Sequence, residues 1–285
     1  MKRCTYCGKE YSDEIAQCPV DGMVLVGEES AVPPVVNMPA RSAVSSPPSS
    51  PATVAILTIG DRPLRVAELL LICVVAFGGS IVLSIYSLFL ELPPTYGGAM
   101  RWSYGVVHET AALALLWYVL LRRSRSFADL GLRWKWSDFG WSLILWFGGG
   151  IAVGAIYRLI YYSGLTSIDH QAVARRVTHY LFGEGVFVGT LIFQCINPFF
   201  EELIVRAYFM TEVRQLTNSL WKPVVLSTAL QMSYHFYQGV PMTIAAGVEF
   251  LIWSLYYAKT KRITPIIMAH LYADVSATLW YMARH

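Results

Sequence analysis

Long apolar segments alternate with short polar ones over most of the 285-residue chain. A helix needs about 20 mainly apolar residues to cross the hydrocarbon core of a bilayer, and helices and closed barrels are the structures that can cross it. Seven segments fit the helical case, over about 66–90, 104–121, 139–162, 186–211, 223–237, 241–258 and 263–282. The pattern therefore predicts an all-α, polytopic bundle of transmembrane helices.

Residues 163–184 interrupt this pattern. Charged and histidine side chains alternate there with valine, leucine and tyrosine at helical spacing, which is typical of an amphipathic helix at the membrane interface. If this segment enters the membrane instead, the bundle has eight spans. The sequence leaves both arrangements open.

Composition supports the membrane assignment. Hydrophobic residues make up 55% of the chain and charged residues only 14%, and the formal net charge of +3 is too small to favour a nucleic-acid partner. The densest basic segments are 122–135 and 259–262, each next to an apolar segment. By the positive-inside rule both are predicted to be cytosolic, on the same side as the N-terminus. The expected location is thus the cell membrane, with a cytosolic N-terminus.

The first 27 residues carry a pattern of metal ligands. Cys4 and Cys7 form one knuckle, and Cys18 with Asp21 forms a second, at a spacing that suits tetrahedral zinc. The segment resembles a small zinc ribbon, which would bind a structural zinc ion and could recruit a cytosolic partner. The alternative is a degenerate knuckle with reduced thiols and no metal. No apolar signal-peptide core follows Met1.

Residues 28–60 are rich in proline, serine and alanine and show neither helical nor strand periodicity. Such a composition is typical of a disordered linker. The predicted organisation is therefore a zinc-ribbon-like module at 1–27, a linker at 28–60 and a membrane domain at 61–285, with its motif-bearing core at 186–283.

The fourth apolar segment contains two adjacent carboxylates and an arginine, Glu201, Glu202 and Arg206. Each ionisable residue in such a segment costs roughly 2.5 to 3.5 kcal/mol to insert, so mutual pairing or a function is expected. Glu202 and Arg206 are four residues apart and share one helix face. Glu201 is left free, and we predict that it is the working carboxylate. The alternative is an ion pair that only joins two helices.

Two histidines in later apolar segments, His235 and His270, are expected at a depth similar to that of Glu201, and Asp274 follows one turn after His270. A carboxylate with imidazoles can activate water as a nucleophile, and a second imidazole can stabilise an oxyanion. Another pair, His108 and Glu109, is predicted to lie at the outer interface, where water reaches it.

These residues carry a specific resemblance. The order Glu201-Glu202-x-x-x-Arg206, His235 and His270-x-x-x-Asp274 is similar to that of the CPBP family of intramembrane proteases, also called ABI or CAAX prenyl protease 2. The resemblance implies an endopeptidase that hydrolyses a peptide bond of a membrane-associated protein. It implies Glu201 as general base, His235 as its partner in activating water, and His270 with Asp274 at the oxyanion. Glu202 and Arg206 would support the glutamate.

The family has also been described as metalloproteases. Zinc at the membrane site is not excluded by the residue types, but we favour water activation by glutamate because Glu202 is committed to Arg206. Two positions depart from the family pattern: Gln231 stands where phenylalanine is usual, and Asp274 where asparagine is common. Two alternatives stay open: an inactive scaffold of the same fold, and a proton or metal carrier.

Overall fold

The computed structural model describes residues 2–3, 10–16, 25–27, 62–89, 98–164, 178, 182 and 188–284. The chain divides into two compact units, Met1–Asp61 and Arg62–His285. The second unit holds the helices and every membrane-site residue predicted above.

The N-terminal unit contains a small antiparallel sheet. Strand β1 (Lys2–Arg3) is central and pairs with β2 (Glu10–Tyr11) on one side and β3 (Val26–Gly27) on the other. The predicted zinc ligands lie outside the described residues: Cys4, Cys7, Cys18 and Asp21. The zinc-binding module and the linker at 28–60 therefore stay predictions.

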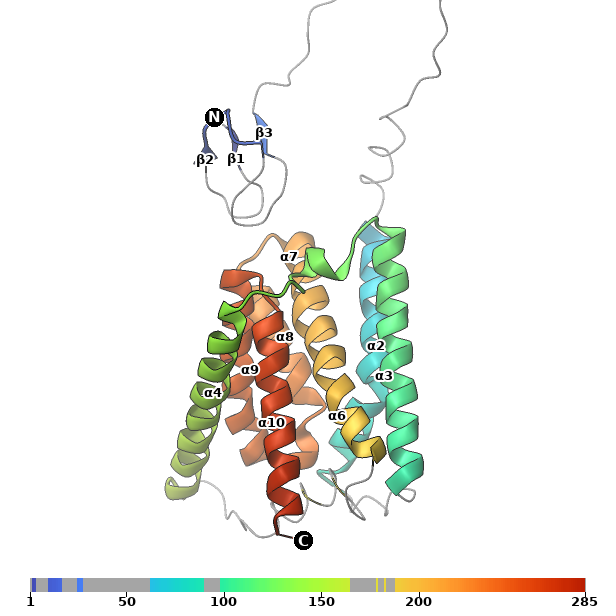
Figure 1. The fold of residues 1–285 in the computed structure, drawn as a ribbon, viewed down its shortest axis with the longest axis vertical. Helices are drawn as coiled ribbons and strands as arrows, with labels where there is room; N and C mark the ends of the chain where they lie inside the picture. Colours follow the sequence, from blue (N-terminus) through green and yellow to red (C-terminus); the bar gives the residue numbers. More distant parts are fainter. Residues whose placement is uncertain are drawn as a thin grey trace, which may run out of the picture. The chain divides into compact units, whose positions relative to one another are not determined.

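The second unit is a bundle of helices (Figure 1). Its helices are α2 (Arg62–Tyr86), α3 (Gly98–Arg122), α4 (Ser137–Tyr162), α6 (Val188–Glu201), α7 (Phe209–Thr217), α8 (Trp221–Ser233), α9 (Val240–Thr260) and α10 (Thr264–Met282). A π-helical segment, η2 (Glu202–Tyr208), joins α6 to α7, and short 3-10 turns occur at η1 (Phe127–Leu130) and η3 (Phe236–Gln238). The predicted all-α membrane fold is confirmed.

Five helical segments of the described chain are long and apolar enough to cross a membrane: Arg62–Tyr86, Trp102–Arg122, Ser137–Tyr162, Val188–Thr217 and Val240–Thr260. The other two predicted spans are also helical. However, α8 has only 13 residues, and α10, with 19 residues, carries His270 and Asp274. The predicted amphipathic segment at 163–184 lies almost entirely outside the described residues.

Apolar side chains cover the outside of the bundle. Leu70 of α2 is 58% exposed and Ile151 of α4 is 72% exposed, and the exposed positions of both helices are mostly of this kind. Contact of this surface with lipid tails costs no free energy, whereas contact with water is unfavourable. Several polar and charged side chains of the same helices instead point inward: Glu68 and Ser84 of α2, and Asp138 and Ser142 of α4.

The segment from α6 through η2 to α7 is a single long helix in the middle of the bundle. It packs against α3, α8 and α10 (Figure 1). Pro198 lies inside α6 and has no backbone N–H, so it cannot bond to the carbonyl one turn earlier. Four residues later the helix changes to π geometry, and all seven residues of η2 are buried. A π segment of this kind is a frequent feature of functional sites.

The two basic loops pack on each other at one end of the bundle. The backbone N–H of Ile263 donates to the carbonyl of Gly131 over 3.3 Å, and the hydroxyl of Thr264 donates to the carbonyl of Arg133 over 3.0 Å. Gly131 has a φ of 91°, and a Cβ there would lie 2.0 Å from the carbonyl oxygen of Lys261. Only glycine therefore permits this contact.

The same end contains an ionic network of two buried glutamates and three arginines. Glu68 of α2 pairs with Arg122 over 3.1 Å and with Arg123. Glu212 of α7 pairs with Arg123 over 2.7 Å and with Arg125 over 3.2 Å. We call this the basic-end network. It ties α2, the end of α3 and α7 together.

Candidate active site

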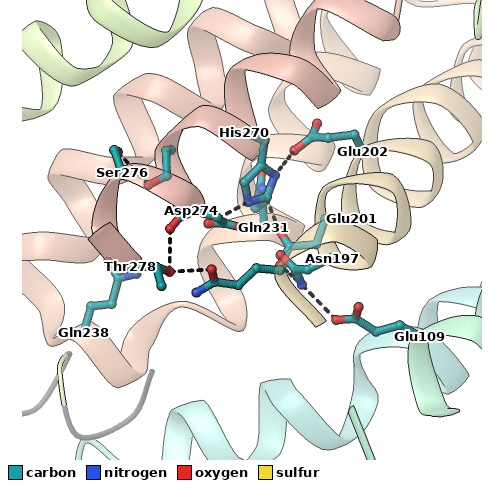
Figure 2. Close-up of polar contacts among 12 residues, drawn as sticks. Glu109, Asn197, Glu201, Glu202, Gln231, Gln238, His270, Asp274, Ser276 and Thr278 are labelled. Carbon is teal, nitrogen blue, oxygen red and sulfur yellow. Dashed lines mark hydrogen bonds and ion pairs between the residues drawn. The ribbon is translucent and has the colours of Figure 1, made fainter. Parts of the chain in front are cut away.

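Glu201 is the last residue of α6, and Glu202 is the first residue of the π-helical segment. Both side chains are buried, at 7% and 0% exposure. In a regular helix, adjacent residues point about 100° apart, so both can face inward only where the helix is surrounded by other elements. Here α3, α8 and α10 pack around the helix, and both carboxylates lie inside the bundle (Figure 2).

Glu202 is fixed by two partners from different elements. One of its oxygens pairs with the guanidinium of Arg206, and the other accepts a hydrogen bond from Nδ1 of His270 over 2.9 Å. Glu202 and Arg206 are both 0% exposed. The predicted pairing of Glu202 with Arg206 is present, and Glu202 also holds the ring of His270 in α10.

Glu201 accepts hydrogen bonds from uncharged groups. Nε2 of Gln231 donates to its Oε2 over 3.0 Å, and the hydroxyl of Tyr234 donates to the same oxygen over 2.9 Å. Its Oε1 has a longer contact, 3.4 Å, with Nδ2 of Asn197. Oε2 is therefore fully engaged, whereas Oε1 keeps room for another ligand.

Gln231 has a role that the sequence did not define. Its amide oxygen accepts a hydrogen bond from Arg206, while its amide nitrogen donates to Glu201. The side chain is 0% exposed. A phenylalanine here could make neither bond, so this departure from the family pattern supplies a polar link between the arginine and the glutamate.

His235 lies at a break between helices. The predicted span at 223–237 is wrong in detail, because α8 ends at Ser233 and a 3-10 turn begins at Phe236. Nδ1 of His235 lies 2.8 Å from the carbonyl oxygen of Gln231. This contact places the proton on Nδ1 and leaves Nε2 of a neutral ring as an acceptor. Glu201 and His270 both lie within electrostatic reach of the ring.

Asp274 lies one turn after His270 on α10. Its Oδ1 is 3.8 Å from Nε2 of His270, which is an ion-pair distance but too long for a direct hydrogen bond. Its backbone carbonyl accepts a hydrogen bond of 2.9 Å from the hydroxyl of Thr278 (Figure 2). The same hydroxyl contacts Gln194 of α6. The ring of His270 thus lies between the carboxyl groups of Glu202 and Asp274.

Glu109 does not face water as predicted, because its side chain is buried inside the bundle. It is 3% exposed, and its Oε1 accepts a hydrogen bond of 2.9 Å from Nδ2 of Asn197, the same nitrogen that contacts Glu201 (Figure 2). Its neighbour His108 instead contacts the carbonyl oxygen of Val75 over 2.9 Å. Helical packing of α3 against α6 turns Glu109 toward the site.

Three side chains could each offer one ligand atom to a metal ion: Glu201, Glu202 and His270. These atoms lie within 4.8 Å of one another. However, the oxygens of Glu202 are already bonded to Arg206 and to His270. A metal bound to Glu202 would compete with one of these contacts and would place a second positive charge near the buried guanidinium, so this donor set fits a metal poorly.

Four of the residues around Glu201 were missed as site residues by the sequence reasoning or were given no role: Glu109, Asn197, Gln231 and Tyr234. Some signals were available. Asn197 is four residues before Glu201, on the same helix face. Glu109 is a carboxylate in an apolar segment, which by itself marks a candidate site. Nothing in its position distinguishes Tyr234 from an ordinary core tyrosine.

Comparison with known proteins gives one match. Residues 183–276 match the family model described as type II CAAX prenyl endopeptidase Rce1-like. The matched segment spans about a third of the chain and includes Glu201, Glu202, His235, His270 and Asp274. No curated protein and no solved structure matches the chain.

Proposed function

We propose that this protein is an intramembrane endopeptidase. The proposal is supported by the match of residues 183–276 to the Rce1-like family, which is a prenyl endopeptidase family. The protein would hydrolyse a peptide bond of a membrane-associated protein or peptide. The observation that carries the proposal is the environment of Glu201, which is buried, bonded to neutral donors and left with one oxygen available.

In this mechanism Glu201 is the general base. A water molecule at Oε1 gives a proton to the carboxylate while its oxygen attacks the carbonyl carbon of the peptide bond. His235 assists by accepting a hydrogen bond from the same water at Nε2, the nitrogen left free by the contact of Nδ1 with Gln231. Glu201 then passes its proton to the leaving amine as the C–N bond breaks.

The oxyanion of the tetrahedral intermediate would be stabilised from α10. With a proton on each nitrogen, the ring of His270 donates from Nδ1 to Glu202 and from Nε2 to the oxyanion. Asp274 supports this form of the ring from 3.8 Å. This arrangement gives Asp274 a role through His270, because an ionised carboxylate cannot itself donate to an oxyanion.

Glu202 and Arg206 support the site without taking part in proton transfer. Arg206 neutralises Glu202 and also bonds to Gln231, which in turn donates to Glu201. The cationic group therefore reaches the catalytic carboxylate only through a neutral amide. This leaves Glu201 free to gain and lose a proton during the reaction.

We further propose that the end of the bundle with the two basic loops faces the cytosol, together with the N-terminus. The N-terminal segment would bind structural zinc through Cys4, Cys7, Cys18 and Asp21 and contact a cytosolic partner. The membrane site would work without metal.

Cleavage by the purified full-length protein in detergent tests the proposal. Two probes are needed, a quenched fluorescent peptide ending in an S-farnesylated CAAX sequence and an unmodified peptide library. We expect cleavage by the wild-type protein and none by the Glu201→Ala and His235→Ala variants, with activity retained after chelation. Cleavage that survives in Glu201→Ala, or no cleavage of either probe, contradicts the proposal.

A further inference from the structure

Glu109 of α3 is a buried carboxyl group that the proposed mechanism does not use. Its side chain is 3% exposed, and its Oε2 has no hydrogen-bond partner in the described part of the chain. Burying a polar atom without a partner costs free energy, so such a group calls for a specific explanation. Its one hydrogen bond of 2.9 Å, to Asn197, leads toward Glu201.

Asn197 lies between two carboxyl groups. Its Nδ2 donates one hydrogen to Glu109 over 2.9 Å and faces Glu201 with the other over 3.4 Å. The amide of an asparagine can turn by 180°, which exchanges its nitrogen and its oxygen. In the turned orientation, the amide oxygen would face Oε1 of Glu201 and repel it. The shorter and stronger bond is the one to Glu109, so Glu109 selects the orientation.

We propose that Glu109 is a positioning residue that acts on Glu201 through Asn197. It holds the amide of Asn197 so that an N–H, and not the oxygen, faces Oε1 of Glu201. This inference rests on the proposed function, in which Oε1 is the oxygen that takes the proton from water. Glu109 itself contacts neither water nor substrate.

The position of Glu109 on a separate helix supports this role. Gln231 and Tyr234 hold Oε2 from α8 and the residue after it, whereas Asn197 belongs to the same helix as Glu201. Without an anchor on α3, the Asn197 amide has no described partner besides Glu201. Glu109 therefore acts, through Asn197, on Oε1, the carboxylate oxygen that Gln231 and Tyr234 do not hold.

Two substitutions of similar size separate a hydrogen-bonding role from a packing role. Glu109→Gln keeps an oxygen that accepts from Asn197, whereas Glu109→Met fills the space without an acceptor. We expect kcat for the farnesylated probe to fall about tenfold in Glu109→Met, the usual effect of losing one aligned hydrogen bond, with KM within twofold. Glu109→Gln should stay within about threefold of the wild type. A wild-type rate in Glu109→Met overturns the proposal.

A double substitution tests the path through Asn197. If Glu109 acts only through this amide, Glu109→Met adds no further loss in an Asn197→Ala background. Independent, multiplying losses in the double variant would overturn the proposal. His108→Gln is the matched control, because His108 is the neighbouring residue on α3 and its hydrogen bond goes to the carbonyl of Val75, not to Asn197 or Glu201.

Infrared spectroscopy gives a readout that does not need activity. The bands of the Glu201 carboxyl group are those lost in Glu201→Gln, and their frequency depends on its hydrogen bonds. They should shift in Glu109→Met and in Asn197→Ala, but not in His108→Gln. Unshifted bands in Glu109→Met overturn the proposal even if no probe peptide is cleaved, while absence of cleavage by the wild type contradicts only the proposed function.

Discussion

Two clusters of buried charge in this bundle differ in how their carboxylates are compensated. In the basic-end network, each oxygen of Glu68 and Glu212 pairs with an arginine. In the central cluster, Glu202 has Arg206 and His270 as partners, but Glu201 has only amide and hydroxyl donors. One cluster is neutralised throughout, and the other contains a carboxylate without a direct cationic partner.

This difference indicates which carboxylates stabilise the fold and which one is suited to take part in a reaction. A carboxylate bonded to two guanidinium groups holds its charge, because protonation would break two charge-assisted hydrogen bonds. A carboxylate held by neutral donors loses less when it takes a proton. This is why we propose Glu201 as the general base, while Glu212, on the same continuous helix, joins α7 to the arginines that follow α3.

The largest expected effect comes from removing the uncompensated carboxylate. Glu201→Gln keeps the size of the side chain and its contacts with Gln231 and Tyr234 in part, but it cannot accept a proton. We expect kcat/KM for the probe peptide to fall about a thousandfold, within the range for loss of a general base, with little change in thermal stability. Initial rates and thermal unfolding in detergent measure both quantities. A loss below tenfold would contradict the assignment.

Removing the central cation should damage the fold as well as the activity. Arg206→Met leaves Glu202 buried and without its guanidinium, which costs about 3 to 5 kcal/mol when one member of a buried pair is lost. Thermal unfolding of the purified variant in detergent measures the effect. The double variant Glu202→Gln with Arg206→Met should recover part of the lost stability. If the double variant is less stable than the single one, the two residues do not act as a pair.

A substitution in the basic-end network should have the opposite effect to Glu201→Gln: it should lower stability and leave activity almost unchanged. Glu212→Gln leaves Arg123 and Arg125 near each other without their shared partner, and both arginines are more exposed than Arg206. We expect a loss of about 1 to 3 kcal/mol in stability and kcat/KM within threefold at a temperature where the variant is folded. If the folded variant keeps its stability but loses activity, Glu212 is not a purely structural residue, and the proposed difference between the two clusters is wrong.

The smallest effect is expected in the loop between α3 and α4, which contains η1. Asp129 accepts hydrogen bonds from the backbone N–H of Ser126 over 2.7 Å and from its hydroxyl over 2.8 Å, and these bonds lower the pKa of Asp129 below its ordinary value of 3.8. A lowered folded-state pKa adds stability that is present above the unfolded pKa and is lost as the pH falls through the folded value.

Asp129→Asn should therefore cost a few tenths of a kcal/mol at neutral pH, since solvent screens this exposed group. The difference from the wild type should shrink as the pH falls below about 3.8 and through the lowered pKa of folded Asp129, because the carboxyl group then becomes protonated in the folded protein as well. Thermal unfolding of both proteins between pH 3 and pH 7 measures it. A constant difference across this range would show that the charge of Asp129 has no role.

The sequence was sufficient for the helical bundle and for the central ion pair, because both follow from local spacing. Apolar segments locate the helices, and the four-residue separation brings Glu202 to Arg206. The partners of Glu201 depend on how distant helices rotate against each other, so Tyr234 and Glu109 could not be paired with it in advance. The end of α8 at Ser233 was missed for a related reason, since hydropathy continues through the turn that carries His235.

The π-helical segment also sets the phase between the two ends of the long helix. Its wider turns fix the angle between Glu202 at its start and Glu212 one helical stretch later, in α7. Each residue of a π turn rotates the helix by less than the roughly 100° of an α residue, so the extra residue is taken up inside this segment and the flanking helices keep their relative phase. Deleting a single residue within it would return this stretch to ordinary α periodicity and would change mainly where the side chains of Glu202 to Tyr208 point. We expect Glu202 to lose its contacts with Arg206 and His270, while Glu212 keeps Arg123 and Arg125, so the extra residue adjusts the candidate site without disturbing the network at the end of the bundle.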